Sequence, residues 1–430
     1  MWARQTSFIR RKRKINAFDF LVLITFGQLG LVHPSLAGMV TSITAKMSRI
    51  ALHYRFTAQA VAFLHKCLLF VLQQKTRQTM PIHSHRLKPF KRIMIFDSSS
   101  WAIDPHFSSI LPGAGGFTSS ATCKVQAAYE YKQGLLCFSE VMPGTKQDNV
   151  FTDKLPELLQ QGDLALTDLG YFKLKTFKRI EIKGAYYISK LRFGTTLIDP
   201  KTDDRIVLLK LLKKSPANQY QMWVNMGIKE PVRCRLVCYK VSSEVANNRR
   251  RQIRKTAKRS GKIPDQRHLA LCDWTLMITN APESLIPMDV LYSFYRIRWQ
   301  IELVFKQLKS VLRINKCNTR KDNRLFCEIY GKLIMAALIH RIHAGINTSL
   351  WNDYGRELSM DKLYKRIQER AMLFARLAII SISALVRFLE KEIPTWIKNC
   401  MKSVQKSRKT TLQLIEFSSS CQSNLFSAAA

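Results

Sequence analysis

The sequence predicts a mixed α/β protein in which a sheet of strands lies between two helical regions. Two observations predict this class. Apolar and alternating segments typical of strands run from residue 92 to residue 190 and recur within 191–285, whereas both ends of the chain show helical periodicity. The 430 residues, 47% of them hydrophobic and 23% charged, are enough for several domains and too apolar for a disordered chain.

Residues 1–88 are expected to form the first domain, which is helical and basic. Helical patterns cover 17–26, 40–51 and 58–72. The apolar run that begins at Phe18 follows a cluster of basic residues and superficially resembles a secretory signal. Asp19 and Gln28 interrupt this run, so we expect a buried or amphipathic helix instead.

Residues 89–190 are expected to form the first part of the core. The predicted elements are, in order, a strand at 92–96, strands at 121–131 and 135–142, a helix at 149–159, a strand at 163–167, a helix at 173–182 and a strand at 185–190. Three antiparallel strands followed by alternating helix and strand is the element order of a ribonuclease-H-like core. An aspartate follows the first and the fourth strand, which are both short and apolar: Asp97 and Asp168.

Residues 191–285 are expected to form a β-rich insertion, because strand-like alternation recurs there. Its predicted strands are 206–212, 220–226, 232–241 and 274–279. Cys234 and Cys238 share one side of the third strand and are expected in the core. The chain is then helical again, with 286–345 completing the core and 346–430 forming a C-terminal region that ends in a polar tail. The predicted helices are 288–313, 323–345 and 360–393.

The charge balance is the most unusual feature of the composition. Sixty-nine Lys and Arg face thirty Asp and Glu, a formal net charge of +39. Such an excess repels itself unless an acidic partner neutralises it, and nucleic acid is the commonest such partner, with an anionic membrane surface as the alternative. The segment 249–262 holds eight Lys or Arg and no acid, which favours a DNA-phosphate patch over a solvated run. Its candidate contacts are Arg249, Arg250, Arg251 and Arg254.

Cysteine usage and hydropathy exclude further classes. Ten Cys in 430 residues, with no CxxC pair, argue against a secreted disulfide scaffold and against a zinc ribbon. Free thiols are typical of a reducing cytoplasm. The apolar run 377–386 is too short to span a bilayer, so we expect no membrane partner. His340 and His343 lie in an apolar helix, which favours a structural role over metal binding.

The third acid of interest lies in the predicted helix 288–313. Four of its polar residues fall within an arc of roughly 60° when successive residues advance by about 100°. They are Tyr295, Arg298, Glu302 and Lys309. A solvated Arg–Glu pair is the simpler interpretation, but it leaves the Tyr and the Lys beside the apolar face unexplained. Three carboxylates at the edge of a sheet are suited to two Mg²⁺ ions that catalyse phosphodiester displacement.

These motifs resemble those of DDE transposases of the insertion-sequence-four family. The family signature is Tyr, two residues, Arg, three residues, Glu, six residues and Lys, which the four residues of the arc match without a gap. Asp97 in Asp97-Ser98-Ser99 matches the first family acid, and Asp168 in Thr167-Asp168-Leu169-Gly170 matches the second. The resemblance covers roughly residues 90–410 and includes the insertion 191–285.

The resemblance implies a ribonuclease-H-like mixed sheet with a β-rich insertion, flanked by helical N- and C-terminal regions. It also implies roles for individual residues. Asp97, Asp168 and Glu302 would be the catalytic metal ligands for two Mg²⁺ ions, with Mn²⁺ as a substitute. Tyr295, Arg298 and Lys309 would contact DNA phosphates near the scissile bond. Trp274, with Trp299 as the second candidate, would stack on a base flipped from a hairpin end, unless it is simply a core tryptophan.

The implied activity is metal-dependent cleavage of double-stranded DNA at transposon ends and transfer of the freed 3′-OH into target DNA. A homodimer in the DNA complex and a cytoplasmic, nucleoid-associated location go with it, and residues 1–88 would then be a DNA-binding region. Two alternatives keep the fold: a catalytically inactive, transposase-derived DNA-binding protein, and a ribonuclease-H-like nuclease without strand transfer.

Overall fold

The computed structural model describes residues 1–11, 16–30, 35–41, 48–74, 85–115, 119–214, 217–317, 319–354, 356–403 and 411–416. The chain separates into two compact units, each made of three segments. Unit 1 comprises residues 1–81, 97–146 and 300–404, and unit 2 comprises 82–96, 147–299 and 405–430.

The predicted mixed α/β class is confirmed. Among the described residues, nine strands form one mixed sheet in the order β3-β2-β1-β4-β5-β9-β8-β7-β6, and helices make up the N- and C-terminal regions. Strand β1 contributes its first four residues to unit 2 and the others to unit 1. The strands are β1 (Ile93–Ala102), β2 (Thr122–Glu130), β3 (Leu135–Pro143), β4 (Leu164–Thr167), β5 (Tyr186–Lys190), β6 (Leu197–Ile198), β7 (Gln219–Met226), β8 (Val232–Lys240) and β9 (Trp274–Thr279).

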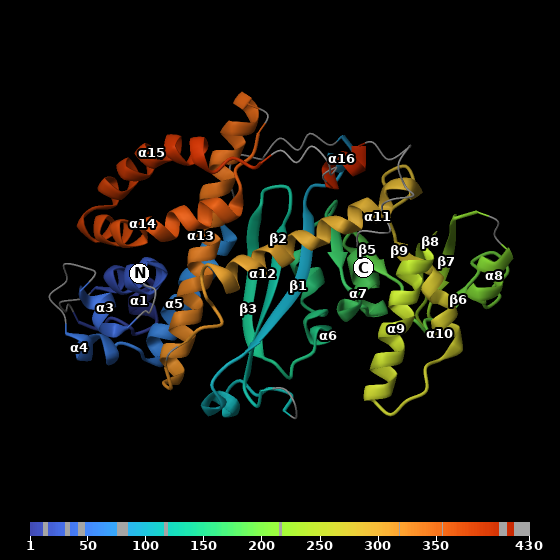
Figure 1. Cartoon of the computed structure of the whole chain (residues 1–430), viewed down its shortest axis with the longest axis horizontal. Helices are drawn as coiled ribbons and strands as arrows, with labels where there is room; N and C mark the ends of the chain where they lie inside the picture. Colours follow the sequence, from blue (N-terminus) through green and yellow to red (C-terminus); the bar gives the residue numbers. More distant parts are fainter. Residues whose placement is uncertain are drawn as a thin grey trace. The chain divides into compact units, whose positions relative to one another are not determined.

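Unit 2 contains the parallel part of the sheet. Residues Ile93–Phe96 of β1 pair in parallel with β4, and β4 pairs in parallel with β5. All four residues of β4 are buried, as expected for a strand covered on both faces. The antiparallel strands β9, β8 and β7 extend the sheet beyond β5 (Figure 1). The helices of unit 2 are α6 (Asp148–Phe151), α7 (Leu174–Ile182), α8 (Leu208–Lys214), α9 (Ser243–Arg259), α10 (Gln266–Ala270), α11 (Met288–Arg296) and α16 (Thr411–Glu416).

Unit 1 is mostly helical. The antiparallel pair β2–β3 contacts the long helix α13 through β3, and α5 also packs against α13 (Figure 1). Buried apolar residues of α13, among them Leu325, Ile329 and Leu333, form the centre of this unit. Its helices are α1 (Trp2–Gln5), α2 (Ala17–Val22), α3 (Leu36–Thr41), α4 (Arg49–His53), α5 (Ala58–Gln73), α12 (Gln300–Ser310), α13 (Asp322–Tyr354), α14 (Met360–Ile380) and α15 (Ile382–Asn399).

Two predicted segments in unit 2 have the wrong structure. Residues 206–212 were expected to form a strand, but Leu208–Lys214 form α8. Leucines at positions 208, 211 and 212 give the three- and four-residue spacing of a helix, and Leu and Lys are good helix formers. The predicted helix 149–159 is broken into α6 and a 3-10 turn at Leu155–Leu158. Pro156 lacks the N–H that a continuing helix requires.

Two long predicted helices are also broken. The helix predicted over 360–393 divides at Ser381, whose backbone is extended, into α14 and α15. The helix predicted over 288–313 divides into α11 and α12 around a 3-10 turn at Ile297–Trp299. Because a 3-10 turn holds about 3.0 residues rather than 3.6, the four polar residues are not carried by one continuous α-helix as predicted. Within α12, Glu302 and Lys309 still share one face, since they are two turns apart.

Other predictions need smaller changes. Strand β1 does not end at Asp97 but continues to Ala102, and the insertion carries helices α8, α9 and α10 as well as strands. Part of the predicted helix 40–51 and most of the polar tail lie outside the described residues. Cys234 and Cys238 are buried, as predicted.

Candidate active site

In unit 2, Asp168 lies directly after β4 and is in contact with the tyrosine of the signature. The Tyr295 hydroxyl donates a hydrogen bond to Asp168 Oδ1 over 3.3 Å. Burial, followed by the negative charge of Asp168, raises the pKa of Tyr295 well above its usual value. The phenol therefore stays protonated and remains a donor that orients the Asp168 carboxylate.

Two cations flank the same tyrosine ring. Lys190 Nζ lies 5.7 Å and Arg298 Cζ 5.9 Å from the Tyr295 ring centroid. Burial lowers the pKa of Lys190, while the charge of Asp168 opposes that shift. Lys190 was not predicted as a site residue, although a signal existed: it ends a predicted strand, and the carboxyl ends of neighbouring parallel strands meet at one edge of a sheet.

In unit 1, a lysine connects the strand that contains Asp97 to the helix that contains Glu302. Lys309 Nζ donates to the Ser100 carbonyl oxygen over 3.1 Å and lies 6.0 Å from the Trp101 ring centroid. Ser100 is three residues, or about 10 Å, along β1 from Asp97. Lys309 is seven residues, or about 10.5 Å, along α12 from Glu302. Along their own elements, Ser100 and Lys309 are thus about equally far from Asp97 and Glu302. Burial lowers the pKa of Lys309.

The parallel ladder of unit 2 relates β1 to β4. Phe96 and Thr167 are the last paired residues of the ladder, and the next residue in each strand is an aspartate: Asp97 and Asp168. Both aspartates are partly exposed. The Asp97 carboxylate accepts the backbone N–H of Ser98 over 2.8 Å. Among the described residues, no three His, Cys, Asp or Glu side chains are close enough together to form a metal site in the present arrangement.

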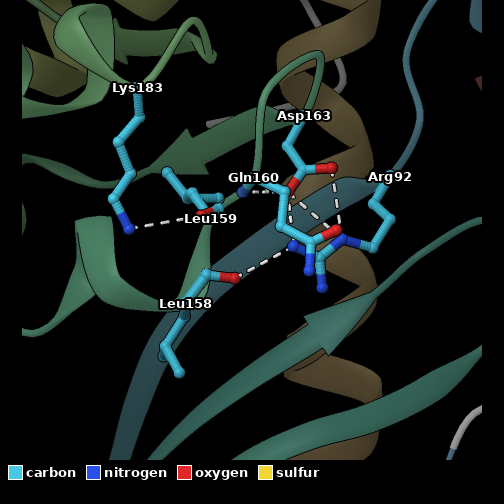
Figure 2. A network of polar contacts seen from close by, with 6 residues as sticks. All are labelled: Arg92, Leu158, Leu159, Gln160, Asp163 and Lys183. Atoms are coloured by element: carbon cyan, nitrogen blue, oxygen red, sulfur yellow. Dashed lines mark hydrogen bonds and ion pairs between the residues drawn. The ribbon is translucent and has the colours of Figure 1, made fainter.

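A buried ion pair joins the opposite ends of the same two strands. Asp163 has no exposed surface and accepts hydrogen bonds from Arg92 Nε at 3.1 Å and from the Gln160 N–H at 2.7 Å. Arg92 Nη2 also donates to the Leu158 carbonyl over 3.0 Å (Figure 2). Because the next residues, Ile93 and Leu164, are the first partners of the ladder, the ion pair holds β1 and β4 in register.

The predicted basic patch is divided by the structure. Arg249 donates to the carbonyls of Cys272 and Trp274 and to Thr275 Oγ1. Arg250 donates to the Leu269 carbonyl and forms an ion pair with Asp273 at 2.6 Å. The run itself contains no acid, and the expectation that it therefore lacks an acidic partner is wrong, because Asp273 pairs with it from outside the run. Its remaining cations are exposed along α9 and just beyond it, and we call these the outer cations: Arg251, Arg254, Lys255, Lys258, Arg259 and Lys262.

The two candidate tryptophans differ in exposure. Trp274 is half-buried at the start of β9, opposite Lys240 of β8, so it is not a fully buried core residue. Trp299 is 55% exposed at the end of the 3-10 turn, three residues before Glu302. The greater exposure favours Trp299 as a surface on which a base can stack.

The paired histidines have the structural role that was predicted. His340 Nδ1 is 2.9 Å from the Gly134 carbonyl oxygen and His343 Nε2 is 3.1 Å from the Leu358 carbonyl oxygen. Burial lowers the pKa of each imidazole to about 4, so both are neutral at physiological pH. None of the helices in the described part of the chain is both long and apolar enough to cross a membrane.

Comparison with known proteins gives the family. The profile of the family described as "Transposase DDE domain" matches residues 88–338, more than half of the chain. The protein therefore belongs to the DDE transposase family, which confirms the resemblance found in the motifs and the predicted class of enzyme.

Curated relatives are insertion-sequence transposases of bacteria. The transposase for insertion sequence element IS231B of Bacillus thuringiensis subsp. berliner is 27% identical over 434 residues, covering 96% of this chain and 91% of that protein. The transposase for IS1151 of Clostridium perfringens is 28% identical over 357 residues, with coverages of 78% and 76%. Among solved structures, the piggyBac transposase synaptic complex with hairpin DNA matches with a TM-score of 0.43 and 12% identity, over 95% of this chain and 83% of that one.

Proposed function

We propose that this transposase cuts double-stranded DNA at the ends of its insertion sequence and joins the freed 3′-OH to target DNA. The observation that supports this most directly is the parallel ladder in which Phe96 and Thr167 are partners and an aspartate follows each. The relatives, named as transposases for insertion sequence elements, agree with this substrate. We also propose that the enzyme acts as a homodimer on DNA of the bacterial nucleoid, in the cytoplasm.

We propose Asp97, Asp168 and Glu302 as the ligands of two divalent ions. The donor chemistry fits Mg²⁺ or Mn²⁺, which prefer carboxylate oxygens. When bound, such ions activate the attacking oxygen and stabilise the leaving oxygen of a phosphodiester.

The neighbouring residues have separate tasks in this proposal. Tyr295 orients Asp168 through its hydroxyl, and Lys309 connects the α12 helix to β1 through Ser100. Arg298 and Lys190 offer positive charge to a DNA phosphate beside Asp168. We propose the outer cations of α9 as further phosphate contacts. Arg249 and Arg250 are assigned to holding β9, because their guanidinium groups bind its backbone and Asp273.

The test is the loss of DNA cleavage without the loss of DNA binding. Asp97→Asn, Asp168→Asn and Glu302→Gln preserve side-chain shape but remove the charge that holds Mg²⁺. Each is expected to abolish cleavage of end DNA while leaving its binding within about twofold, and Glu369→Gln, an exposed ion-pair acid on α14, serves as the control. Cleavage within about tenfold of the parent, a barrier change of only ~1.4 kcal/mol, would remove that residue from the site.

The same assay separates the two alternatives. DNA binding with no cleavage in the parent protein would indicate an inactive, transposase-derived binding protein. Cleavage without joining of the 3′-OH to a target plasmid would indicate a nuclease.

A further inference from the structure

A buried lysine on α13 holds the loop that ends the helix carrying Glu302. Lys332 is only 6% exposed, and its Nζ donates to the carbonyl oxygens of Arg313 and Lys316, each over 2.9 Å. Lysine is almost never buried to this degree unless its charge is compensated. An apolar residue could fill the same space, but only a donor can bind two carbonyls of one loop.

The loop needs this support because its backbone turns abruptly. Arg313 adopts a left-handed conformation with φ of +48°, a position that usually favours glycine. The Leu312 N–H bonds back to the Gln307 carbonyl over 3.1 Å and the Ile314 N–H to the Leu308 carbonyl over 2.9 Å, so the chain folds back on the last turns of α12. The Lys332 ammonium thus binds the carbonyl of the residue with positive φ in the turn that ends α12.

Other contacts of the same loop converge on this point. Gln368 of α14 donates to the Val311 carbonyl over 3.3 Å. Glu328, one turn before Lys332, is 1% exposed and forms an ion pair with Arg324 at 2.7 Å. The loop residue Cys317 lies near these two charges. Burial raises the pKa of its thiol to about 11, so the thiol adds no charge. Two cations and one carboxylate of α13, Lys332, Arg324 and Glu328, therefore lie near Cys317 of the loop.

We infer that Lys332 is a positioning residue that fixes the C-terminal end of α12 and thereby the place of Glu302 beside the metal ions. This inference rests on the proposed function, since it takes Glu302 as a ligand. Glu302 is eight residues, about 12 Å, from the end of a short and rigid helix. Motion at the loop is transmitted along such a helix, and a displacement of about 1 Å at a reacting group can cost about a hundredfold in rate.

The test compares Lys332→Met with a matched change on the same helix. Lys332→Met keeps the aliphatic chain and removes the donor. Arg341→Met is the control, because Arg341 also donates from α13 to two carbonyls at a helix end, those of Val71 and Gln74 at α5. Hydrogen exchange of the α12 amides and the Mn²⁺-dependent rise in melting temperature are measured together with cleavage of end DNA.

Lys332→Met is expected to speed α12 exchange and to raise the half-saturating Mn²⁺ concentration about tenfold, whereas Arg341→Met should affect only α5. Lys332→Arg should restore most of the difference. If Lys332→Met does not fold, Gln368→Leu tests the same loop with smaller effects. Equal α12 exchange and equal Mn²⁺ requirement in the two Met variants would overturn the inference. A parent protein that neither binds Mn²⁺ nor cleaves would instead refute the proposed function, while the α12 exchange would still judge the role of Lys332.

Discussion

The ion pair between Arg92 and Asp163 gives the sharpest stability prediction. Asp163 is fully buried, whereas the Arg92 side chain is 27% exposed, so the two partners are not equivalent. Arg92→Met leaves a buried carboxylate that accepts a hydrogen bond from the Gln160 N–H but has lost its guanidinium partner. Asp163→Asn leaves an arginine that can turn toward water and an amide oxygen that can still accept the Gln160 N–H.

The magnitudes follow from this asymmetry. Leaving a buried charge uncompensated costs about 3–5 kcal/mol, which is the expected loss for Arg92→Met. Losing a hydrogen bond to a charged group costs about 1.5–3 kcal/mol, which is the expected loss for Asp163→Asn. The double variant Arg92→Met/Asp163→Leu removes both charges together and should be more stable than Arg92→Met alone, because no buried charge remains.

Urea unfolding of the parent, Arg92→Met, Asp163→Leu and the double variant, followed by far-UV circular dichroism, measures the coupling of the pair as a thermodynamic cycle, and Asp163→Asn is measured beside them. The coupling free energy of the pair is expected to exceed about 1 kcal/mol. Lys173→Met, which removes an exposed ion pair with Asp153, is the control and should cost at most about 1 kcal/mol. Two outcomes would show that the carboxylate is not held by the guanidinium: a loss of stability below about 1 kcal/mol for Arg92→Met, or a loss for Asp163→Asn that exceeds the loss for Arg92→Met.

Three further predictions concern DNA binding and pH. Replacing Arg251, Arg254 and Lys258 with Ala should flatten the slope of log K for DNA binding against log salt concentration by roughly 2 to 3, since each phosphate contact contributes about 0.9. The matched control replaces three exposed cations of α15, Arg387, Lys391 and Lys398. An equal change of slope in both variants would argue against α9 as a specific DNA contact. Trp299→Ala should impair hairpin formation more than the first nick without lowering the melting temperature, whereas Trp274→Ala should also destabilise the protein, and a reversed result would return the stacking role to Trp274. The free energy of unfolding should fall by a few kcal/mol as pH drops from 6.5 to about 4. In this range the imidazoles of His340 and His343 bind protons in the unfolded chain, whereas in the folded protein, where their pKa is about 4, they stay neutral. His343→Gln should make this pH dependence shallower, and an unchanged pH profile of stability would contradict the prediction.

Much of the core could be predicted from the sequence because its strands carry a strong local signal. β4 is four buried residues in an apolar run, and β2 and β3 alternate around a turn that needs the positive φ of Gly134. The α8 helix was missed because its leucines suit either periodicity over seven residues. The division of 288–313 was missed because no proline or glycine marks the 3-10 turn at Ile297–Trp299.

The four signature residues, Tyr295, Arg298, Glu302 and Lys309, could be picked out by their spacing in the sequence. The contacts that their side chains make could not be predicted in this way. Lys309 is expected to contact DNA, which stays a prediction, and in the structure its ammonium donates to the Ser100 carbonyl of β1. That contact depends on how a helix packs beside a strand some two hundred residues away in the chain. The role of Lys332 could not be predicted from the sequence for a similar reason. The two carbonyls that it binds come within reach of its ammonium only once the loop after α12 has folded.

The basic run shows most clearly why charge in a sequence does not identify a surface. Arg249, Arg250 and Arg251 are consecutive, so on α9 they lie about 100° apart. The first two reach carbonyls near the start of β9 and Asp273, whereas Arg251 is exposed and donates within its own helix to Asn248. Replacing all three together would therefore mix a loss of β9 anchoring with a loss of phosphate contacts. A salt-dependence experiment can measure DNA contacts only if Arg249 and Arg250 are left in place and the substitutions are confined to the outer cations.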